Sequence, residues 1–331
     1  MQSDGTLLLR RSDVARLVTL RECIDGVEKI FRWQGEGKVA APAILGVRSA
    51  HGSLHIKAGL LGNDRSYLVA KLNTNFSDNT RQFGLPTIQG VIVLYDGENG
   101  YPLAVIDSID ITVKRTAAAS AVAAKYLASP DSSIATICGC GTQGHAHLWA
   151  LHTIFPLKKI QAFDTDEGRA KKFATALADE LNLEIEPVRD LEDAIRKTDI
   201  CVTCTPSRQF FVRKENVSPG TFIAAVGADD EHKQEIDPAL LASSKVVPDN
   251  LAQCSTIGEL HHAIRQGLMR KEDAYAELSE IVADRKRGRT TVEEIIIFDS
   301  TGIATEDAIV AATVYEKARA AMIGDYFKFA A

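Results

Sequence analysis

The stretch Cys138-Gly139-Cys140-Gly141-Thr142-Gln143-Gly144 decides the fold of this chain. An apolar run at residues 133–137 precedes it and predicts a β-strand, and a helical pattern begins near Gln143. A strand, a G-x-G-x-x-G turn and a helix gather backbone N–H groups at a helix N-terminus, where a pyrophosphate binds well. The glycines permit the tight turn and the close approach that a Cβ atom would block. The stretch therefore predicts a dinucleotide-binding βαβ unit.

Asp164 indicates which dinucleotide this unit binds. It ends the apolar run at residues 159–163, which predicts the second strand, and it lies twenty positions after Gly144. An acidic residue at this point can bind an adenosine ribose and repels a 2′-phosphate. The pattern favours NAD over NADP, and use of NADP as well stays open. The alternative is a glycine turn in an α/β domain that binds no nucleotide.

The rest of the region alternates strands and helices, as a doubly wound parallel sheet requires. The helical patterns lie near residues 166–182 and 190–197, and the strand patterns lie at residues 199–205, 221–226, 245–248 and 295–298. We therefore predict an α/β fold with a Rossmann-type domain over residues 119–304. Cofactors bind beyond the carboxyl ends of such strands. This rule points to Thr205, Pro206, residues 227–230 and residues 300–302.

Residues 1–118 predict a different, antiparallel α+β domain. They suggest a short strand and a helix at residues 7–32 and strands at residues 43–48, 53–58, 67–73 and 88–95. Asp-Gly and Asn-Gly pairs between residues 94 and 103 predict a hairpin. An alanine-rich helix near residues 110–128 leads to the nucleotide domain. A helical pattern near 305–322 could return, so we expect residues 305–331 to pack on the first domain.

Size and charge limit the function without deciding it. The 331 residues suggest two domains, and 45% hydrophobic and 25% charged residues are ordinary for a soluble protein. A formal net charge of −6 gives no reason to expect a nucleic acid or an anionic membrane as partner. No apolar run approaches the about 18 residues that span a bilayer, and residues 1–30 show no signal peptide.

The six cysteines predict a reducing compartment, and we expect a cytoplasmic protein. Cys201 and Cys204 form a C-x-x-C pair that is also found in redox and zinc sites. The pair lies inside a predicted buried strand, however, and no second ligand pair accompanies it. We therefore expect core cysteines and no metal site.

Three cations stand in otherwise apolar elements of the first domain: Arg48, Lys71 and Arg115. A guanidinium binds a carboxylate through two hydrogen bonds, and an ammonium adds a point charge. The alternative is that each is a solvated surface charge. The acidic loop at residues 227–235 follows a strand at the cofactor edge. A carboxylate there could transfer a proton, or the loop could be a surface turn.

Seven stretches occur together and in order: Lys71, Leu85-Pro86-Thr87, residues 94–107, Lys114-Arg115-Thr116-Ala117-Ala118, residues 139–144, Val226-Gly227-Ala228-Asp229 and Phe298-Asp299-Ser300-Thr301-Gly302. Through them the chain resembles the ornithine cyclodeaminase/mu-crystallin family over essentially its whole length. The resemblance implies a homodimer with an N-terminal substrate and dimerisation domain and a Rossmann domain. Members include cyclodeaminases, alanine dehydrogenases, ketimine reductases and other imino-acid reductases.

The resemblance also implies roles for matching residues. Arg48, Lys71 and Arg115 would hold the α-carboxylate of an amino or imino acid, and Asp229, with Lys71 as the second catalytic residue, would exchange a proton with the α-nitrogen. An iminium carbon accepts hydride readily when its nitrogen is protonated and its carboxylate is neutralised. The residues that would contact NAD are Thr87, Arg115, Gly139, Gly141, Thr142, Gln143, Gly144, Asp164, Thr165, Thr205, Pro206, Val226, Gly227, Lys233 and Ser300.

Three departures from the family pattern bear on the substrate. His55 replaces the glutamate of cyclodeaminases, Lys57 replaces a usual methionine, and Thr301 replaces an apolar residue on the substrate side. Strand alternation places His55 and Lys57 on one face. Such a pocket favours an anionic side chain, which predicts an imino-acid reductase that converts iminosuccinate to aspartate.

Several alternatives remain open. This face could be merely polar and wet. The enzyme could be an ornithine cyclodeaminase, an alanine dehydrogenase or a ketimine reductase. A binding protein that holds a nucleotide and a small acid without catalysis is the alternative outside the enzymes.

Overall fold

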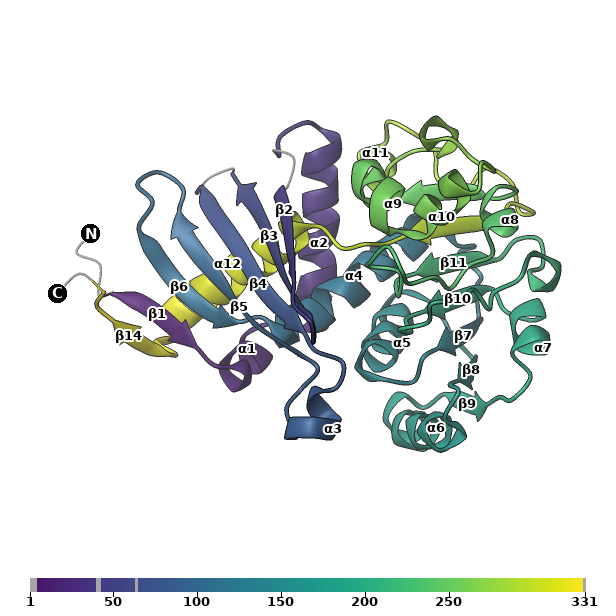
Figure 1. Cartoon of the computed structure of the whole chain (residues 1–331), viewed down its shortest axis with the longest axis horizontal. Helices are drawn as coiled ribbons and strands as arrows, with labels where there is room; N and C mark the ends of the chain where they lie inside the picture. The colour runs from purple at the N-terminus through teal and green to yellow at the C-terminus, as the bar shows by residue number, and fades with distance from the viewer. Residues whose placement is uncertain (1–4, 40–42, 63–64, 330–331) are drawn as a thin grey trace. The chain divides into compact units, whose positions relative to one another are not determined.

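The computed structural model describes residues 5–39, 43–62 and 65–329. The chain divides into two compact units, of which unit 1 comprises Met1–Arg115 with Ile303–Ala331 and unit 2 comprises Thr116–Gly302. The first boundary falls inside helix α4 (Ile109–Leu127) (Figure 1). It lies three residues before the boundary expected from the sequence, because the alanine-rich helix continues without a break across it.

Unit 1 is built on a seven-stranded sheet in the order β14-β1-β6-β5-β4-β3-β2. Its strands are β1 (Thr6–Leu9), β2 (Ala43–Arg48), β3 (Ser53–Leu61), β4 (Tyr67–Asn75), β5 (Ile88–Asp96), β6 (Pro102–Asp107) and β14 (Asp325–Phe327). The expectation of an antiparallel sheet was wrong at one point, since β1 pairs with β6 in parallel. The intervening helices and strands supply the long crossover that a parallel pair needs. The three-residue strand β14 was not predicted, because it is too short to show alternation.

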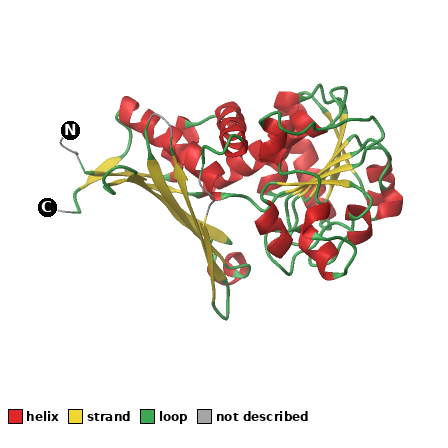
Figure 2. Ribbon diagram, turned by 90° about the horizontal axis from the view of Figure 1, so that it is seen from above, coloured by secondary structure: helices red, strands yellow, loops and turns green. Residues whose placement is uncertain are grey.

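Helices lie against one face of this sheet (Figure 2). They are α1 (Arg11–Leu17), α2 (Leu20–Gly35) and α12 (Ala304–Ala321), and a short helix α3 (Asn79–Phe83) precedes β5. The side chains of Thr19 and Glu22 form a capping box at the start of α2. Helix α12 packs on β3, β4 and α2. The C-terminal segment therefore returns to the sheet of unit 1.

Unit 2 contains a second seven-stranded sheet, in the order β12-β13-β11-β10-β7-β8-β9. Every pairing is parallel, and the strands are β7 (Ile134–Cys138), β8 (Lys159–Phe163), β9 (Glu184–Pro187), β10 (Ile200–Thr203), β11 (Phe222–Ala225), β12 (Lys245–Pro248) and β13 (Ile296–Asp299). The chain moves outward from β7 in one direction and then from β10 in the other. This reversal is the switch point at which such folds bind nucleotides, and it confirms the predicted Rossmann-type fold.

The helices of unit 2 are the part of α4 from Thr116 onward, α5 (Thr142–Ile154), α6 (Glu167–Leu181), α7 (Leu191–Arg196), α8 (Pro238–Leu241), α9 (Leu251–Ile257), α10 (Glu259–Arg265) and α11 (Leu278–Val282). Two short 3₁₀ helices, η1 (Lys214–Asn216) and η2 (Lys271–Asp273), complete the elements. Helices α8 to α11 were not predicted, because each is too short to show a helical period. The strands β10, β11 and β13 are buried along their whole length and form the centre of the core.

All six cysteines are free, and Cys201 lies buried in β10 as expected. Cys204 follows the strand and is half-buried, and its thiol donates hydrogen bonds to the carbonyls of Cys138 and Gly139. In the described part of the chain, no helix is both long and apolar enough to cross a membrane.

Candidate functional site

The glycine-rich loop of unit 2 has the shape of a phosphate cradle. Gly139 has a φ of +105°, and a Cβ atom there would lie 2.9 Å from the Cys204 carbonyl oxygen. A Cβ atom on Gly144 would lie 2.2 Å from the Gly139 carbonyl oxygen. Gly141 caps α5, and a Cβ atom there would meet nothing within 4 Å. The loop is therefore closed toward the protein and open at the helix N-terminus, which fits a pyrophosphate.

A buried polar atom beside this loop also fits a bound cofactor. The side-chain Oε1 of Gln143, in the first turn of α5, is buried and has no hydrogen-bond partner among the described residues. Buried polar atoms without a partner are rare in folded proteins. Thr142 is exposed at the same helix end. The predicted contacts of both residues with NAD stay predictions, with which this free oxygen and this exposure agree.

Asp164 ties the end of β8 to the glycine loop. Its Oδ2 accepts a hydrogen bond from the Cys140 N–H at 3.0 Å, and its Oδ1 accepts one from the Asp166 N–H at 3.0 Å. Two carboxylate oxygens offer about four acceptor positions, so a ribose hydroxyl can still bind. Thr165 is exposed beside it. Arg169, which the sequence analysis missed, lies 3.6 Å from the same carboxylate.

Glu235 joins two loops that were predicted to contact the cofactor. Its Oε1 accepts from the N–H and the hydroxyl of Thr205, each at 2.7 Å, and its Oε2 accepts from the Gly227 N–H at 2.8 Å. Burial raises the pKa of Glu235, against the hydrogen bonds it accepts, which lower it. A Cβ atom on Gly227 would lie 2.5 Å from this carboxylate. Pro206 is exposed and Val226 is buried beside these contacts.

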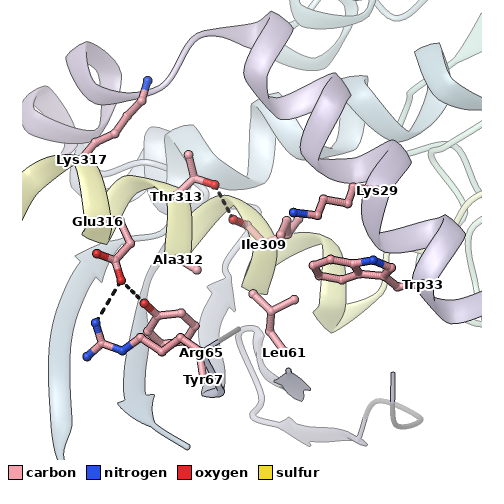
Figure 3. A pocket seen from close by; sticks show the side chains of 10 residues that line it. All are labelled: Lys29, Trp33, Leu61, Arg65, Tyr67, Ile309, Ala312, Thr313, Glu316 and Lys317. Carbon is pink, nitrogen blue, oxygen red and sulfur yellow. Dashed lines mark hydrogen bonds and ion pairs between the residues drawn. The ribbon is translucent and has the colours of Figure 1, made fainter. Parts of the chain in front are cut away.

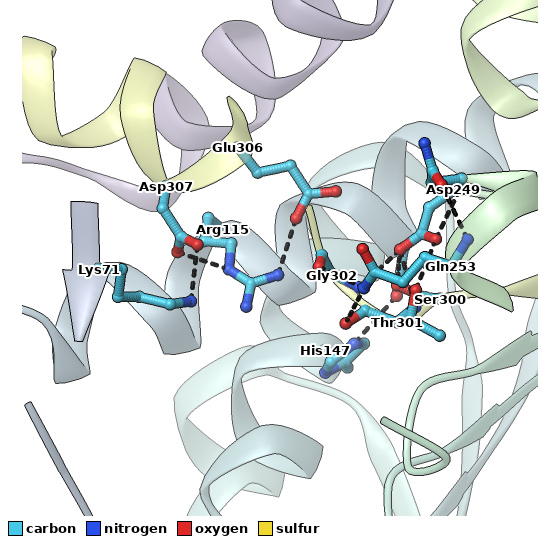
Figure 4. Close-up of polar contacts among 12 residues, drawn as sticks. Lys71, Arg115, His147, Asp249, Gln253, Ser300, Thr301, Gly302, Glu306 and Asp307 are labelled. Carbon is cyan, nitrogen blue, oxygen red and sulfur yellow. Dashed lines mark hydrogen bonds and ion pairs between the residues drawn. The ribbon is translucent and has the colours of Figure 1, made fainter. Parts of the chain in front are cut away.

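Asp249 holds the segment that includes Ser300 and Thr301 (Figure 4). Its Oδ2 accepts from the N–H groups of Thr301 at 2.7 Å and Gly302 at 2.6 Å, and its Oδ1 accepts from the Thr301 hydroxyl at 3.0 Å. The Gln253 side chain donates to the Thr301 and Gly302 carbonyls at 3.2 and 3.0 Å. Because Asp249 binds the Thr301 hydroxyl, the predicted contact of Thr301 with substrate stays a prediction.

Asp229 follows β11 and is exposed, as a proton donor to a bound substrate must be. Its Oδ1 lies 2.5 Å from the Lys233 ammonium. Burial alone would lower the pKa of Lys233, but the carboxylates of Asp229, Asp230 and Glu235 outweigh it and raise that pKa. The predicted proton donor and a predicted cofactor contact are therefore partners in unit 2.

In unit 1, the register of the sheet gathers the predicted substrate residues on the face that carries α12. Lys57 of β3 lies directly opposite Lys71 of β4, and Ile92 of β5 completes this row. His55 lies one row further, and its ring nitrogen is 2.7 Å from the Ser53 hydroxyl. Arg48 lies on the same face at the exposed end of β2, opposite Ser53. The predicted placement of His55 and Lys57 on one strand face is confirmed.

Two acidic residues of α12, which the sequence analysis read only as part of a helix, meet these cations (Figure 4). The Lys71 ammonium lies 2.6 Å from Asp307 Oδ2. Arg115 Nε donates to Asp307 Oδ1 at 2.9 Å, and its Nη1 donates to Glu306 Oε2 at 2.7 Å. All four side chains are buried. Thr87, the remaining predicted residue, lies before β5 in unit 1, and its carbonyl accepts from the Phe76 N–H.

The cluster changes the acidity of its members. Burial lowers the pKa of Lys71 to about 7, assisted by the charges of Arg115 and Lys57, while Asp307 raises it. Burial would raise the pKa of Asp307, but Arg115, Lys71 and Lys57 outweigh it and lower that pKa. Lys71 can therefore gain or lose a proton near neutral pH.

A separate cavity of about 430 Å³ lies between α2, β4 and α12 (Figure 3). Trp33 and Lys29 stand at one end of it, and Tyr67 and Arg65 stand at the other. Three of its polar side chains pair with one another, since Arg65 and the Tyr67 hydroxyl both donate to Glu316. None of the residues predicted for the site lines this cavity.

The chain is similar to known dehydrogenases and reductases over nearly its whole length. It is 39% identical to the alanine dehydrogenase of Archaeoglobus fulgidus over 98% of both chains, and 33% identical to the iminosuccinate reductase of Paracoccus denitrificans over 95% of this chain and 97% of that protein. The solved structure of an archaeal alanine dehydrogenase dimer with bound NAD is 38% identical in sequence to this chain. The two superpose with a TM-score of 0.94, over 98% of this chain and 99% of that one. The model of the ornithine cyclodeaminase/mu-crystallin family matches residues 5–322. The chain belongs to the ornithine cyclodeaminase/mu-crystallin family.

Proposed function

We propose that this chain, an NAD-dependent oxidoreductase of carbon–nitrogen bonds, reduces a small acidic 2-imino acid, with iminosuccinate, which gives aspartate, as the best candidate. The observation that carries the substrate proposal is the position of Lys57, directly opposite Lys71 and on the face that carries α12. The likeness to an iminosuccinate reductase over nearly the whole chain supports it.

Each residue would have a defined task. Lys71 and Arg115, with Arg48, would hold the α-carboxylate, and Lys57 and His55 would face a second carboxylate. Asp229 would protonate the nitrogen, which makes the adjacent carbon electrophilic. NADH, when bound, supplies the hydride to that carbon. The glycine loop, Asp164 and the loops joined by Glu235 would hold the cofactor.

An alanine dehydrogenase activity is the second candidate, favoured by the charge balance of the cluster. Glu306 and Asp307 offset two of the three cations Lys57, Lys71 and Arg115. Within this cluster, which does not include the exposed Arg48, one positive charge remains, and it suits a substrate with a single carboxylate. The identity of 39% to an alanine dehydrogenase supports the same reading. An ornithine cyclodeaminase is less well supported, because the cations Lys57 and Lys71 would repel a second ammonium group.

Replacement of Lys57 separates the first two candidates. We expect Lys57→Met to lower kcat/KM for iminosuccinate, formed from oxaloacetate and ammonia, by roughly tenfold or more, because a charged hydrogen bond is worth about 1.5–3 kcal/mol. The value for pyruvate with ammonia should change far less. Lys57→Arg, which keeps the charge, is the matched control. Equal losses with both substrates, measured as NADH oxidation, would remove the argument for an anionic pocket.

The proposal includes a homodimer formed through the open face of the unit 1 sheet. Leu45 and Val47 of β2, Leu60 of β3, Leu68 of β4 and Val91 of β5 are between 37% and 57% exposed. The strand register places them on the face opposite Lys71. A continuous exposed apolar surface of this kind marks a protein interface. The relative solved as a dimer supports this assembly, and the six free cysteines support a reducing compartment such as the cytoplasm.

A further inference from the structure

The N-terminal turn of α12 brings two carboxylates to the cations proposed to bind the substrate acid. Glu306 and Asp307 are both fully buried. A buried carboxylate costs several kcal/mol in free energy unless cations or hydrogen-bond donors compensate it. The pairing with Lys71 and Arg115 supplies this compensation. The two acidic residues, however, do not occupy equivalent positions.

Asp307 is the carboxylate that Lys71 and Arg115 share. One oxygen lies 2.6 Å from the Lys71 ammonium, and the other accepts from Arg115 Nε at 2.9 Å. Glu306 instead accepts from the other end of the guanidinium, Arg115 Nη1, at 2.7 Å. Removal of the Asp307 charge should therefore affect both cations, whereas removal of the Glu306 charge should affect mainly the guanidinium.

The surroundings of Lys71 make this shared carboxylate important. Lys57 of β3 and Arg115 of α4 both place positive charge beside the Lys71 ammonium, and the opposite residue on β5 is the apolar Ile92. Asp307 of α12 is the negative group that offsets them. Two like charges in a buried cluster favour loss of the proton from a third.

We propose that Asp307 is a positioning residue, which holds Lys71 and Arg115 as one anion-binding pair and keeps Lys71 charged for the α-carboxylate of the substrate. This inference rests on the proposed function. It assigns Asp307 to the binding of the substrate acid through its two partners, with no contact to the substrate itself.

The test is the pH dependence of kcat/KM for the Asp307→Asn enzyme between pH 5.5 and 9, with imino-acid substrate and NADH. Loss of the carboxylate removes the interaction that raises the pKa of Lys71, so the ammonium should lose its proton at lower pH. We expect the alkaline limb of the profile to move down by about one pH unit or more, and KM at pH 8 to rise about tenfold, with a smaller change in kcat.

Three variants control the experiment. Asp307→Glu, which keeps the charge, should restore the limb in part, and Glu306→Gln should leave it in place. Lys71→Arg changes a proposed carboxylate ligand and should lower activity, but the limb should be absent from the activity that remains, because arginine keeps its proton throughout this range. NADH binding by fluorescence and thermal unfolding establish that each variant is folded.

The outcomes separate this inference from the function on which it rests. An active wild type with an unmoved limb in Asp307→Asn, an equal shift in Glu306→Gln, or a persistent limb in Lys71→Arg overturns the role of Asp307 alone. If the wild type is folded but oxidises NADH in the presence of none of the imino acids tested, the proposed function and this inference are both overturned.

Discussion

Asp229 and Lys233 show how single residues of this protein depend on their charge partners. The ion pair at 2.5 Å favours the ionised form of the Asp229 carboxylate. An ionised carboxylate can accept a proton from an amino acid but cannot donate one to an imine. Lys233 is also a predicted cofactor contact, so binding of NAD to this ammonium would weaken its ion pair with Asp229 and favour uptake of a proton by the carboxylate.

The replacement Asp229→Asn tests the role of this carboxylate. An amide cannot transfer the proton, and general acid catalysis typically contributes about 10²–10⁴ in rate, so we expect turnover to fall by about that factor. The affinity for NADH should change little. Asp230→Asn is the matched control, since that neighbouring carboxylate accepts from the His232 N–H and has no proposed role in proton transfer. A variant that keeps more than about a tenth of wild-type turnover contradicts the role of Asp229 as proton donor.

Residues with local roles could be predicted from the sequence, and their distant partners could not. The glycines and Asp164 act within one βαβ unit, so their spacing is visible in the sequence. Asp249 meets Thr301 across 52 positions, and Asp307 meets Arg115 across 192. No local pattern encodes such pairs, which form only when the sheets assemble.

At the scale of elements, strand register turns a sequence pattern into two different surfaces. Because side chains alternate along β3 and β4, Lys57 and Lys71 lie on the face that carries α12, and apolar side chains lie on the open face. A shift of one residue would exchange the two sets, so both proposed functions of this sheet depend on the same register. The long strands β3, β4 and β5 were predictable because they alternate over enough residues. The edge strand β9 was not, because it is short and contains two glutamates and a proline.

Leu68→Glu tests the open face of this sheet. Leu68 is 44% exposed, so the change should leave the fold of unit 1 intact. A charge buried without a partner at an interface costs several kcal/mol, so we expect the dimer to dissociate into monomers at micromolar concentration. Val292→Glu in unit 2, at a side chain that is 76% exposed, is the matched control. Light scattering after gel filtration measures the mass, and an unchanged dimer in Leu68→Glu excludes this face.

Across the whole molecule, the two units bury charge in different ways. In unit 1, cations and carboxylates compensate one another. In unit 2, Asp299 accepts from the N–H groups of Glu259 and Leu260, and Glu259 accepts from those of Glu235 and Ile236. Glu235 in turn accepts from Thr205 and Gly227. These carboxylates connect the ends of several strands at the proposed cofactor edge. Backbone N–H groups, rather than cations, compensate their charge.

Carboxylates held in this way make the stability of unit 2 depend on pH. Burial, with the charge of Asp249, raises the pKa of Asp299 from 3.8 to about 7, against the hydrogen bonds that lower it. Between these values the unfolded chain has lost this proton and the folded protein retains it. Each such proton lowers the free energy of unfolding by up to about 1.4 kcal/mol per pH unit as the pH rises. The stability that Asp299 contributes should therefore be greatest near pH 4 and disappear as the pH approaches 7.

Comparison with Asp299→Asn isolates this contribution from the other titrating groups, including His261 and His262, whose lowered pKa values act in the opposite sense. An amide does not titrate, so we expect the stability of the variant relative to wild type to improve by about 2 kcal/mol from pH 5 to pH 7. Urea unfolding in a Trp33→Phe background, followed by the fluorescence of Trp149, reports on unit 2. A constant difference between Asp299→Asn and wild type would show that Asp299 is ionised in the folded protein throughout this range.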